Sequence, residues 1–110
     1  MSTFDRFGIT IWENQGKGRF MQCMISWKIT PGDYIACARR FIETGGADVE
    51  GITTIGRWHA PGSSYGWHLV EGTPEAVAKQ VAVWNPYISI EVTPVITDEA
   101  AAPAVASVLE

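Results

Sequence analysis

The 110-residue sequence has little that would indicate a metal centre, a disulfide framework or a nucleic-acid interface. Its only two cysteines, Cys23 and Cys37, form no C-x-x-C pair and lie among apolar residues, which is typical of small buried side chains. Lysine and arginine are scattered apart from Arg39-Arg40, and the net charge is −4. Because nucleic-acid binding depends on neutralising phosphates, this charge argues against a nucleic-acid partner.

Long apolar runs are also missing. No stretch approaches the roughly 18 consecutive apolar residues of a membrane span. The first twenty residues show no basic segment followed by an apolar one, as a secretory signal would. Phosphate-binding glycine loops and the G-x-S-x-G turn of serine hydrolases do not occur either. We therefore expect a cytoplasmic protein without a membrane partner.

The patterns that are present predict alternating strands and helices. They indicate strands at 20–29, 51–59, 64–71 and 88–93, and helices at 34–44 and 74–84. We expect the Asp33 carboxylate to cap the first helix and Gly45-Gly46 to end it. Thr73 should cap the second helix, and Gly62-Ser63 should form the two-residue loop of a hairpin.

The order β-α-β-β-α-β predicts a ferredoxin-like α+β fold, in which two helices cover one face of a four-stranded antiparallel sheet. Residues 19–97 would form this domain, residues 1–18 an extension that adds an edge strand, and residues 98–110 an alanine-rich tail. The other face of the first and last strands is mixed rather than simply charged. Such a face is commonly covered by a second copy, so we expect a homodimer.

Part of the chain resembles a family of small bacterial proteins of unknown function within the dimeric α/β-barrel superfamily. The matching stretches are SWKITPG (26–32), RRFIETGG (39–46), GRWH (56–59) and VWNPYISIEVTPVITDE (83–99). The resemblance implies the same fold and a dimer whose two sheets face each other across a barrel-like interior. The wider superfamily includes cofactor-free monooxygenases, isomerases, haem-binding or haem-degrading enzymes and plain binding proteins. The resemblance therefore implies no single reaction, because fold does not fix function.

The stretch GRWHAPGSSYGWH (56–68) holds both histidines of the chain. An even-length turn divides its large side chains between two faces, with Arg57, His59 and His68 on one and Trp58 and Trp67 on the other. If the tryptophans pack under the helices, the arginine and the histidines face the space between the two protomers. This interpretation predicts a polar-lined pocket in an otherwise apolar barrel.

Such a pocket would bind a small hydrophobic or aromatic acid, with isomerase or cofactor-free oxygenase chemistry as an open extension. The predicted site consists of His59 and His68 as catalytic residues and of Arg57, Trp58, Tyr65, Trp67 and Glu91 as binding residues. An imidazole titrates near neutral pH and suits a general base, and the guanidinium fork of Arg57 suits a carboxylate or an enolate.

The alternative is a non-catalytic interaction dimer, in which Arg57 pairs with Glu91 or Glu71 across the interface. A metal site from His59, His68 and Glu71 is not expected, because the predicted register places Glu71 on the opposite face and no H-x-H or H-x-x-x-H spacing occurs. We expect no resident cofactor; haem enters only through the superfamily resemblance.

Overall fold

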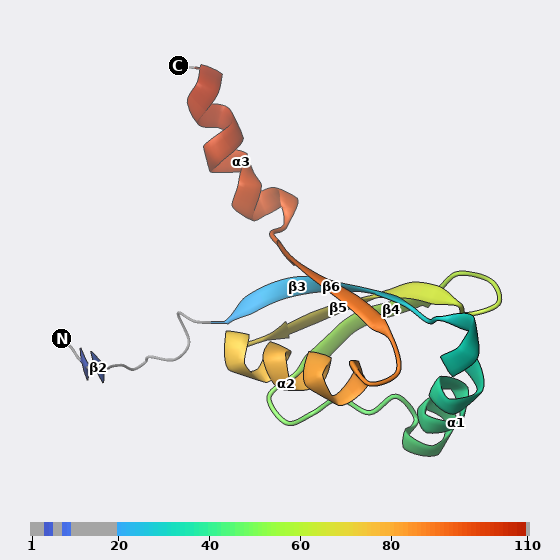
Figure 1. Cartoon of the computed structure of the whole chain (residues 1–110). Coiled ribbons are helices and arrows are strands. Elements are labelled where there is room, and N and C mark those ends of the chain that lie inside the picture. Colours follow the sequence, from blue (N-terminus) through green and yellow to red (C-terminus); the bar gives the residue numbers. More distant parts are fainter. Residues whose placement is uncertain (1–3, 6–7, 10–19, 110) are drawn as a thin grey trace.

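The computed structural model describes residues 4–5, 8–9 and 20–109. Its main sheet has the order β4-β5-β3-β6, and each neighbouring pair is antiparallel. The strands are β3 (Met21–Lys28), β4 (Thr53–His59), β5 (Tyr65–Gly72) and β6 (Ser89–Val95). The helices α1 (Tyr34–Thr44) and α2 (Pro74–Trp84) lie on one face of this sheet (Figure 1). The predicted ferredoxin-like arrangement is confirmed.

Short elements flank this body. In the N-terminal extension, β1 (Phe4–Asp5) and β2 (Gly8–Ile9) pair in a separate two-stranded sheet, so these residues do not add the predicted edge strand, and the rest of 1–18 lies outside the described residues. The remaining elements are η2 (Pro31–Asp33), α3 (Asp98–Ala106) and η3 (Ser107–Leu109). Within the described ranges, no helix has the length and apolar character needed to cross a bilayer.

The ends of the helices follow local chemistry with one exception. Thr73 Oγ1 accepts a hydrogen bond from the Ala76 amide at 3.2 Å, as a capping threonine should. Gly45 ends α1 in the left-handed conformation, with φ of +67°. The predicted cap by Asp33 is wrong, because its carboxylate accepts a 2.6 Å hydrogen bond from the Thr30 hydroxyl and makes no bond to a helix amide.

The core lies between the sheet and α2. Cys23, Ile25, Val70 and Val77 are buried there against one another. The register of β3 with β5 places Ile25 opposite His68, so His68 joins the face that the helices cover and only 5% of its surface is exposed. A histidine is thus part of an otherwise apolar layer.

The hairpin of β4 and β5 keeps the predicted pairing but presents the opposite face to the helices. Arg57 lies opposite His68, and Trp58 lies opposite Trp67. The tryptophans are 52% and 41% exposed on the open face of the sheet, so the prediction that they pack under the helices is wrong. Alternation shows which residues share a face, but the register with β3 decides which face is covered.

The aromatic residue on the covered face at this level is Trp27, which is half-buried and lies opposite Gly66. A Cβ on Gly66 would overlap the Trp27 ring, so the missing side chain provides the space that the indole fills. The turn at the tip of the hairpin also differs from the predicted one. The Ser63 amide bonds to the Ala60 carbonyl at 2.7 Å, which makes Pro61-Gly62 the centre of the turn rather than Gly62-Ser63.

Candidate functional site

A cavity of about 290 Å³ lies between the helices and the sheet. Its apolar wall includes Ile25, Trp27, Cys37, Phe41, Val81 and Trp84. The cavity also reaches Arg57, His59 and His68. The sequence predicted that Arg57, His59 and His68 face the space between two protomers, but in the structure these side chains lie on the face that the helices of the same chain cover.

A β-bulge in β4 brings the polar end of the cavity together. Thr54 pairs with Val70 and Gly56 pairs with Leu69, so Ile55 is an extra residue in the strand. In a regular strand, two residues three positions apart, such as Thr54 and Arg57, would face opposite sides of the sheet, because strand side chains alternate. With the bulge, both side chains reach His68.

Arg57 is held by one side chain of α1 and by two groups in the loop that follows this helix. Its Nη2 donates to the Gly46 carbonyl at 2.8 Å and lies 3.6 Å from Asp48 Oδ1. Its guanidinium carbon lies 5.7 Å from the centre of the Phe41 ring, a distance typical of cation–π contact. A Cβ on Gly46 would lie 2.6 Å from both Arg57 Nη1 and the Phe41 ring, so the glycine permits this close approach.

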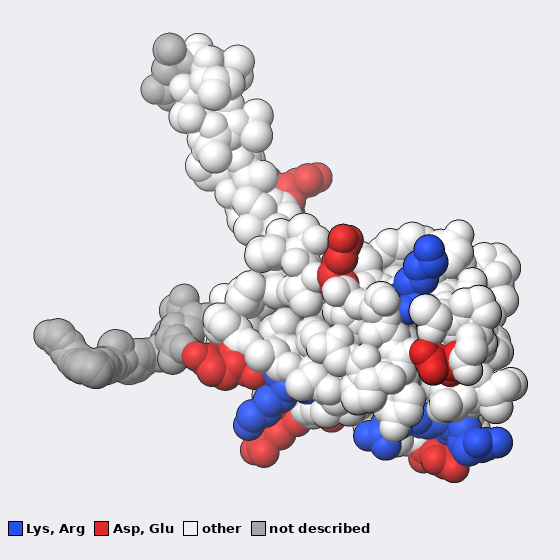
Figure 2. All heavy atoms as spheres, viewed as in Figure 1, with Lys and Arg blue, Asp and Glu red and all other residues white. Residues whose placement is uncertain are grey.

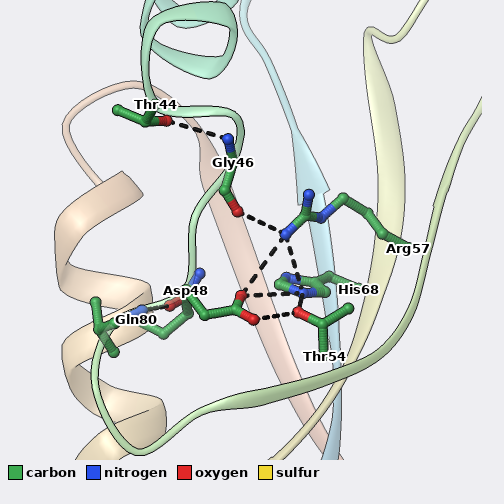
Figure 3. Close-up of polar contacts among 8 residues, drawn as sticks. Thr44, Gly46, Asp48, Thr54, Arg57, His68 and Gln80 are labelled. Atoms are coloured by element: carbon green, nitrogen blue, oxygen red, sulfur yellow. Dashed lines mark hydrogen bonds and ion pairs between the residues drawn. The ribbon is translucent and has the colours of Figure 1, made fainter.

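The protonation of His68 follows from a chain of hydrogen bonds (Figure 3). Thr54 Oγ1 lies 2.5 Å from Asp48 Oδ2 and 2.8 Å from His68 Nε2. The carboxylate only accepts, so the single hydroxyl hydrogen of Thr54 goes to Asp48, and His68 Nε2–H must donate to Thr54. Nδ1 then carries the lone pair and has no hydrogen-bond partner among the described residues. The 3.4 Å approach of Arg57 to Nε2 is a contact without a shared hydrogen.

The pKa of His68 is lowered from 6.5 to about 4, mainly by burial and secondly by the positive charge of Arg57, while Asp48 opposes the change. The imidazole is therefore neutral at pH 7. A neutral ring beside a guanidinium and a carboxylate leaves one positive and one negative group at this end of the cavity.

Two polar groups lack hydrogen-bond partners among the described residues: Gln80 lines the cavity, and Asp48 lies behind the lining residues Arg57 and His68. Asp48 Oδ1 is buried, but its nearest cationic neighbours, Arg57 and His68, stand 3.6 and 3.7 Å away. Gln80 is 3% exposed and accepts from the Val49 amide through Oε1 at 2.9 Å. Its amide nitrogen makes no hydrogen bond within the described part of the chain, and the side chain lines the cavity. Buried groups of this kind are normally satisfied by water or a ligand.

The other predicted site residues divide between the two faces. His59 lines the cavity and makes edge contacts with the rings of Trp27 and Phe41, at centroid distances of 5.2 and 5.5 Å. Four residues lie on the open face, away from the cavity: Trp58, Tyr65, Trp67 and Glu91. Glu91, opposite Ser26, is thus not grouped with Arg57, whose ion-pair partner is Asp48 of the same chain.

Metal and haem ligation find little support in the donor atoms. Among residues 4–5, 8–9 and 20–109, no three His, Cys, Asp or Glu side chains form a group that would hold a metal ion. His68 already uses Nε2 in its bond to Thr54, so that atom does not suit an iron ligand. We derive no chemistry through either group.

Three polar residues of the site, Asp48, Thr54 and Gln80, were not predicted from the sequence. Gln80 carried a usable signal, because it interrupts the apolar stripe of Val77, Val81 and Trp84 on the second helix. A polar residue on a buried helical face needs a partner. No sequence pattern pointed to Asp48, since it lies in a loop without periodicity. Only the folded chain brings its carboxylate close to Arg57 and His68.

Comparison with protein families finds that a family model described as a domain of unknown function (DUF3303) matches residues 21–109. No curated protein matches the chain, and no solved structure does. The match covers all four strands of the main sheet and extends through α3.

Proposed function

Since the chain belongs to the DUF3303 family, whose description assigns no function, we propose a function from geometry: the cavity binds a small apolar acid. The observation that carries the proposal is an apolar cavity that ends at Arg57 and at the Gln80 amide nitrogen, which makes no hydrogen bond to any described residue. An apolar wall with a few converging polar groups is the usual composition of a ligand site, and a volume near 300 Å³ suits a small molecule.

The wall favours a flat or ring-containing apolar part. Trp27, Phe41 and Trp84 come from three different elements and all line the cavity. Edge or offset contacts with an aromatic wall stabilise a bound ring, in addition to the free energy gained when its apolar surface is buried. This part of the ligand would lie between β3 and the two helices.

The polar end favours an acidic group. Arg57 uses Nη2 for its contacts with Gly46 and Asp48, while Nε and Nη1 make no hydrogen bond to any described residue. The free amide hydrogens of Gln80 provide a second donor in the same cavity. A carboxylate would accept from both, and its bond to the guanidinium would be strengthened by charge.

The histidine favours binding over proton transfer. A general base works best when its pKa lies near the operating pH, whereas His68 has a pKa of about 4. Its Nδ1 still suits a hydrogen bond from the ligand, since a neutral imidazole accepts through the unprotonated nitrogen. Isomerase or oxygenase chemistry at this site stays a prediction that these contacts do not support.

We expect 2-naphthoate to bind the wild-type chain more tightly than the neutral 2-naphthalenemethanol, by roughly tenfold or more, because hydrogen bonds to charged groups contribute about 1.5–3 kcal/mol. Arg57→Met should remove this preference. Titration calorimetry, with quenching of tryptophan fluorescence as a second readout, gives both dissociation constants.

Arg39→Met is the matched control, because it makes the same change at an exposed position outside the cavity. It should keep the preference for the acid. The ratio of the two affinities is read within each variant, so a general loss of stability does not mimic the effect. Equal ratios in wild type and Arg57→Met, or no binding of either probe to the wild type, would refute the proposal.

A second candidate function, an interaction dimer, is favoured by the open face of the sheet. Trp58, Tyr65 and Trp67 expose 52%, 48% and 41% of their surface on this face. Trp67 pairs with Trp58 across the strands and meets Tyr65 edge to face at a centroid distance of 5.7 Å. Exposed aromatic clusters are typical of interfaces, and a two-fold dimer would cover both copies of the cluster at once.

Trp67→Asp is expected to convert a dimer into a monomer, because the new carboxylate would be buried without a partner at the interface. Light scattering coupled to size exclusion measures the mass at several protein concentrations. Ile35→Asp is the control, since it adds the same charge at an exposed residue of α1, on the other side of the molecule. A wild-type chain that stays monomeric throughout the series would exclude this candidate.

A further inference from the structure

The C-terminal helix is the least packed part of the described chain. In α3 and η3, Ala101 is half-buried and every other residue from 98 to 109 is exposed. The element rises from the end of β6 and stands away from the body (Figure 1). It nevertheless lies within the segment that the family model matches, so it belongs to the domain.

Such a helix needs a packing partner. It has nine α-helical residues followed by one 3-10 turn, and Pro103 lies inside it. Isolated helices shorter than about 12–15 residues are marginal in water, and an interior proline removes a further hydrogen bond. Thr97 caps its start through a 3.1 Å bond from the Ala100 amide, but one cap does not offset this cost.

The composition of the helix indicates what kind of partner it needs. Val105, Val108 and Leu109 are 64%, 78% and 83% exposed. Their spacing of three and four residues places them on one side of the helix, which we call the α3 stripe. Figure 2 shows the helix almost entirely without charge, and its acidic residues, Asp98 and Glu99, lie in the first turn. An uncharged stripe of this size fits an apolar protein surface.

The direction of the helix identifies that surface. In Figure 1, α1 and α2 lie on one side of the sheet and α3 projects on the other, the side of the open face. The exposed Trp58 and Trp67 lie on this same side. A second copy stacked on the open face would therefore meet the projecting helix, and by symmetry its own helix would meet this chain.

We propose that α3 and η3 form an arm that packs through the α3 stripe against the second copy of a sheet-to-sheet dimer. This inference rests on the interaction dimer and extends it, because the arm adds a contact outside the sheet face. It does not depend on the ligand cavity. The arm would gain the packing that its length and proline require, and the dimer would gain buried apolar area.

The test is sedimentation equilibrium on full-length chains over a wide concentration range. Val105→Asp with Val108→Asp should weaken the dimer at least tenfold in dissociation constant, as loss of anchoring apolar residues does. The matched control is Ala100→Asp with Ser107→Asp, which adds the same charge on the opposite side of the helix. The control should keep the wild-type dissociation constant within about a factor of two to three, the effect of a near-neutral interface contact.

Each other outcome overturns the proposal in a distinguishable way. Equal dissociation constants for wild type and the stripe variant would refute the arm and leave the sheet-face dimer standing. An unchanged dimer with a lower melting temperature would place the helix on its own chain. A wild type that is monomeric at every concentration would remove both the arm and the dimer, while the binding of 2-naphthoate would still be decided separately.

Discussion

Gly66→Ala is expected to lower the free energy of unfolding by about 2–3 kcal/mol, the upper part of the usual range for overpacking. A methyl group at this position would overlap the Trp27 ring on one side and the Trp58 carbonyl on the other. The indole lies over the core side of the sheet and lines the cavity, whereas the carbonyl belongs to the adjacent strand and can move only with that strand. Urea denaturation followed by tryptophan fluorescence measures the change.

Gly32→Ala provides the comparison, because nothing lies within 4 Å of the Cβ it would introduce and its φ is not positive. Alanine there should leave stability unchanged or raise it by about 0.5 kcal/mol, since it restricts the unfolded chain. If both alanine variants unfold at the same urea concentration, the space beside Gly66 is not filled by Trp27 in solution.

Acidification should destabilise the protein through His68. Its pKa is about 4 in the folded chain and 6.5 when unperturbed, so between these values the unfolded state binds the extra proton. The contribution of His68 to stability is therefore fully present above about pH 6.5 and is lost as the pH falls toward 4. Between pH 7.5 and 5 the loss is about 2 kcal/mol, because each unit of pKa difference corresponds to about 1.4 kcal/mol.

Chemical denaturation at a series of pH values tests this expectation. His68→Gln should be less stable at pH 7.5 but should lose less stability on acidification, because glutamine does not titrate. His59→Gln makes the same change at the other histidine of the cavity, so comparing the two variants shows how much of the pH dependence belongs to His68. Parallel curves for wild type and His68→Gln would show that His68 is not buried as a neutral ring.

The sequence predicted the elements and their order well, because those depend on local patterns. The alternation of Met21 to Ile29 and the capping threonine at 73 each act within a few residues. The strand order follows from them, since two crossovers and one hairpin leave few arrangements. The Asp33 cap failed at the same local scale, because Thr30 competes for its carboxylate.

The position of the candidate site was beyond the reach of local patterns. The hairpin alternation correctly placed Arg57 with His68, but the covered face depends on the pairing of Ile25 with His68, which are 43 positions apart. Tryptophans as large as Trp58 and Trp67 would normally be assigned to the core. Here Trp27 fills the space on the covered face of the sheet, because Gly66 has no side chain there. Asp48 joined the site through the bulge and the loop, which leave no periodic trace in the sequence.

The extra residue at Ile55 bears on how relatives of this protein should be compared. A relative that keeps these residues but has one residue fewer in this strand needs no bulge, because its threonine and arginine are then two positions apart and face the same side of a regular strand. A relative that keeps the present spacing but pairs without a bulge would turn its threonine to the far side of the sheet, and the carboxylate would lose its link to the imidazole. A relative must therefore match the spacing between threonine and arginine to the presence or absence of the bulge in order to build the same polar end.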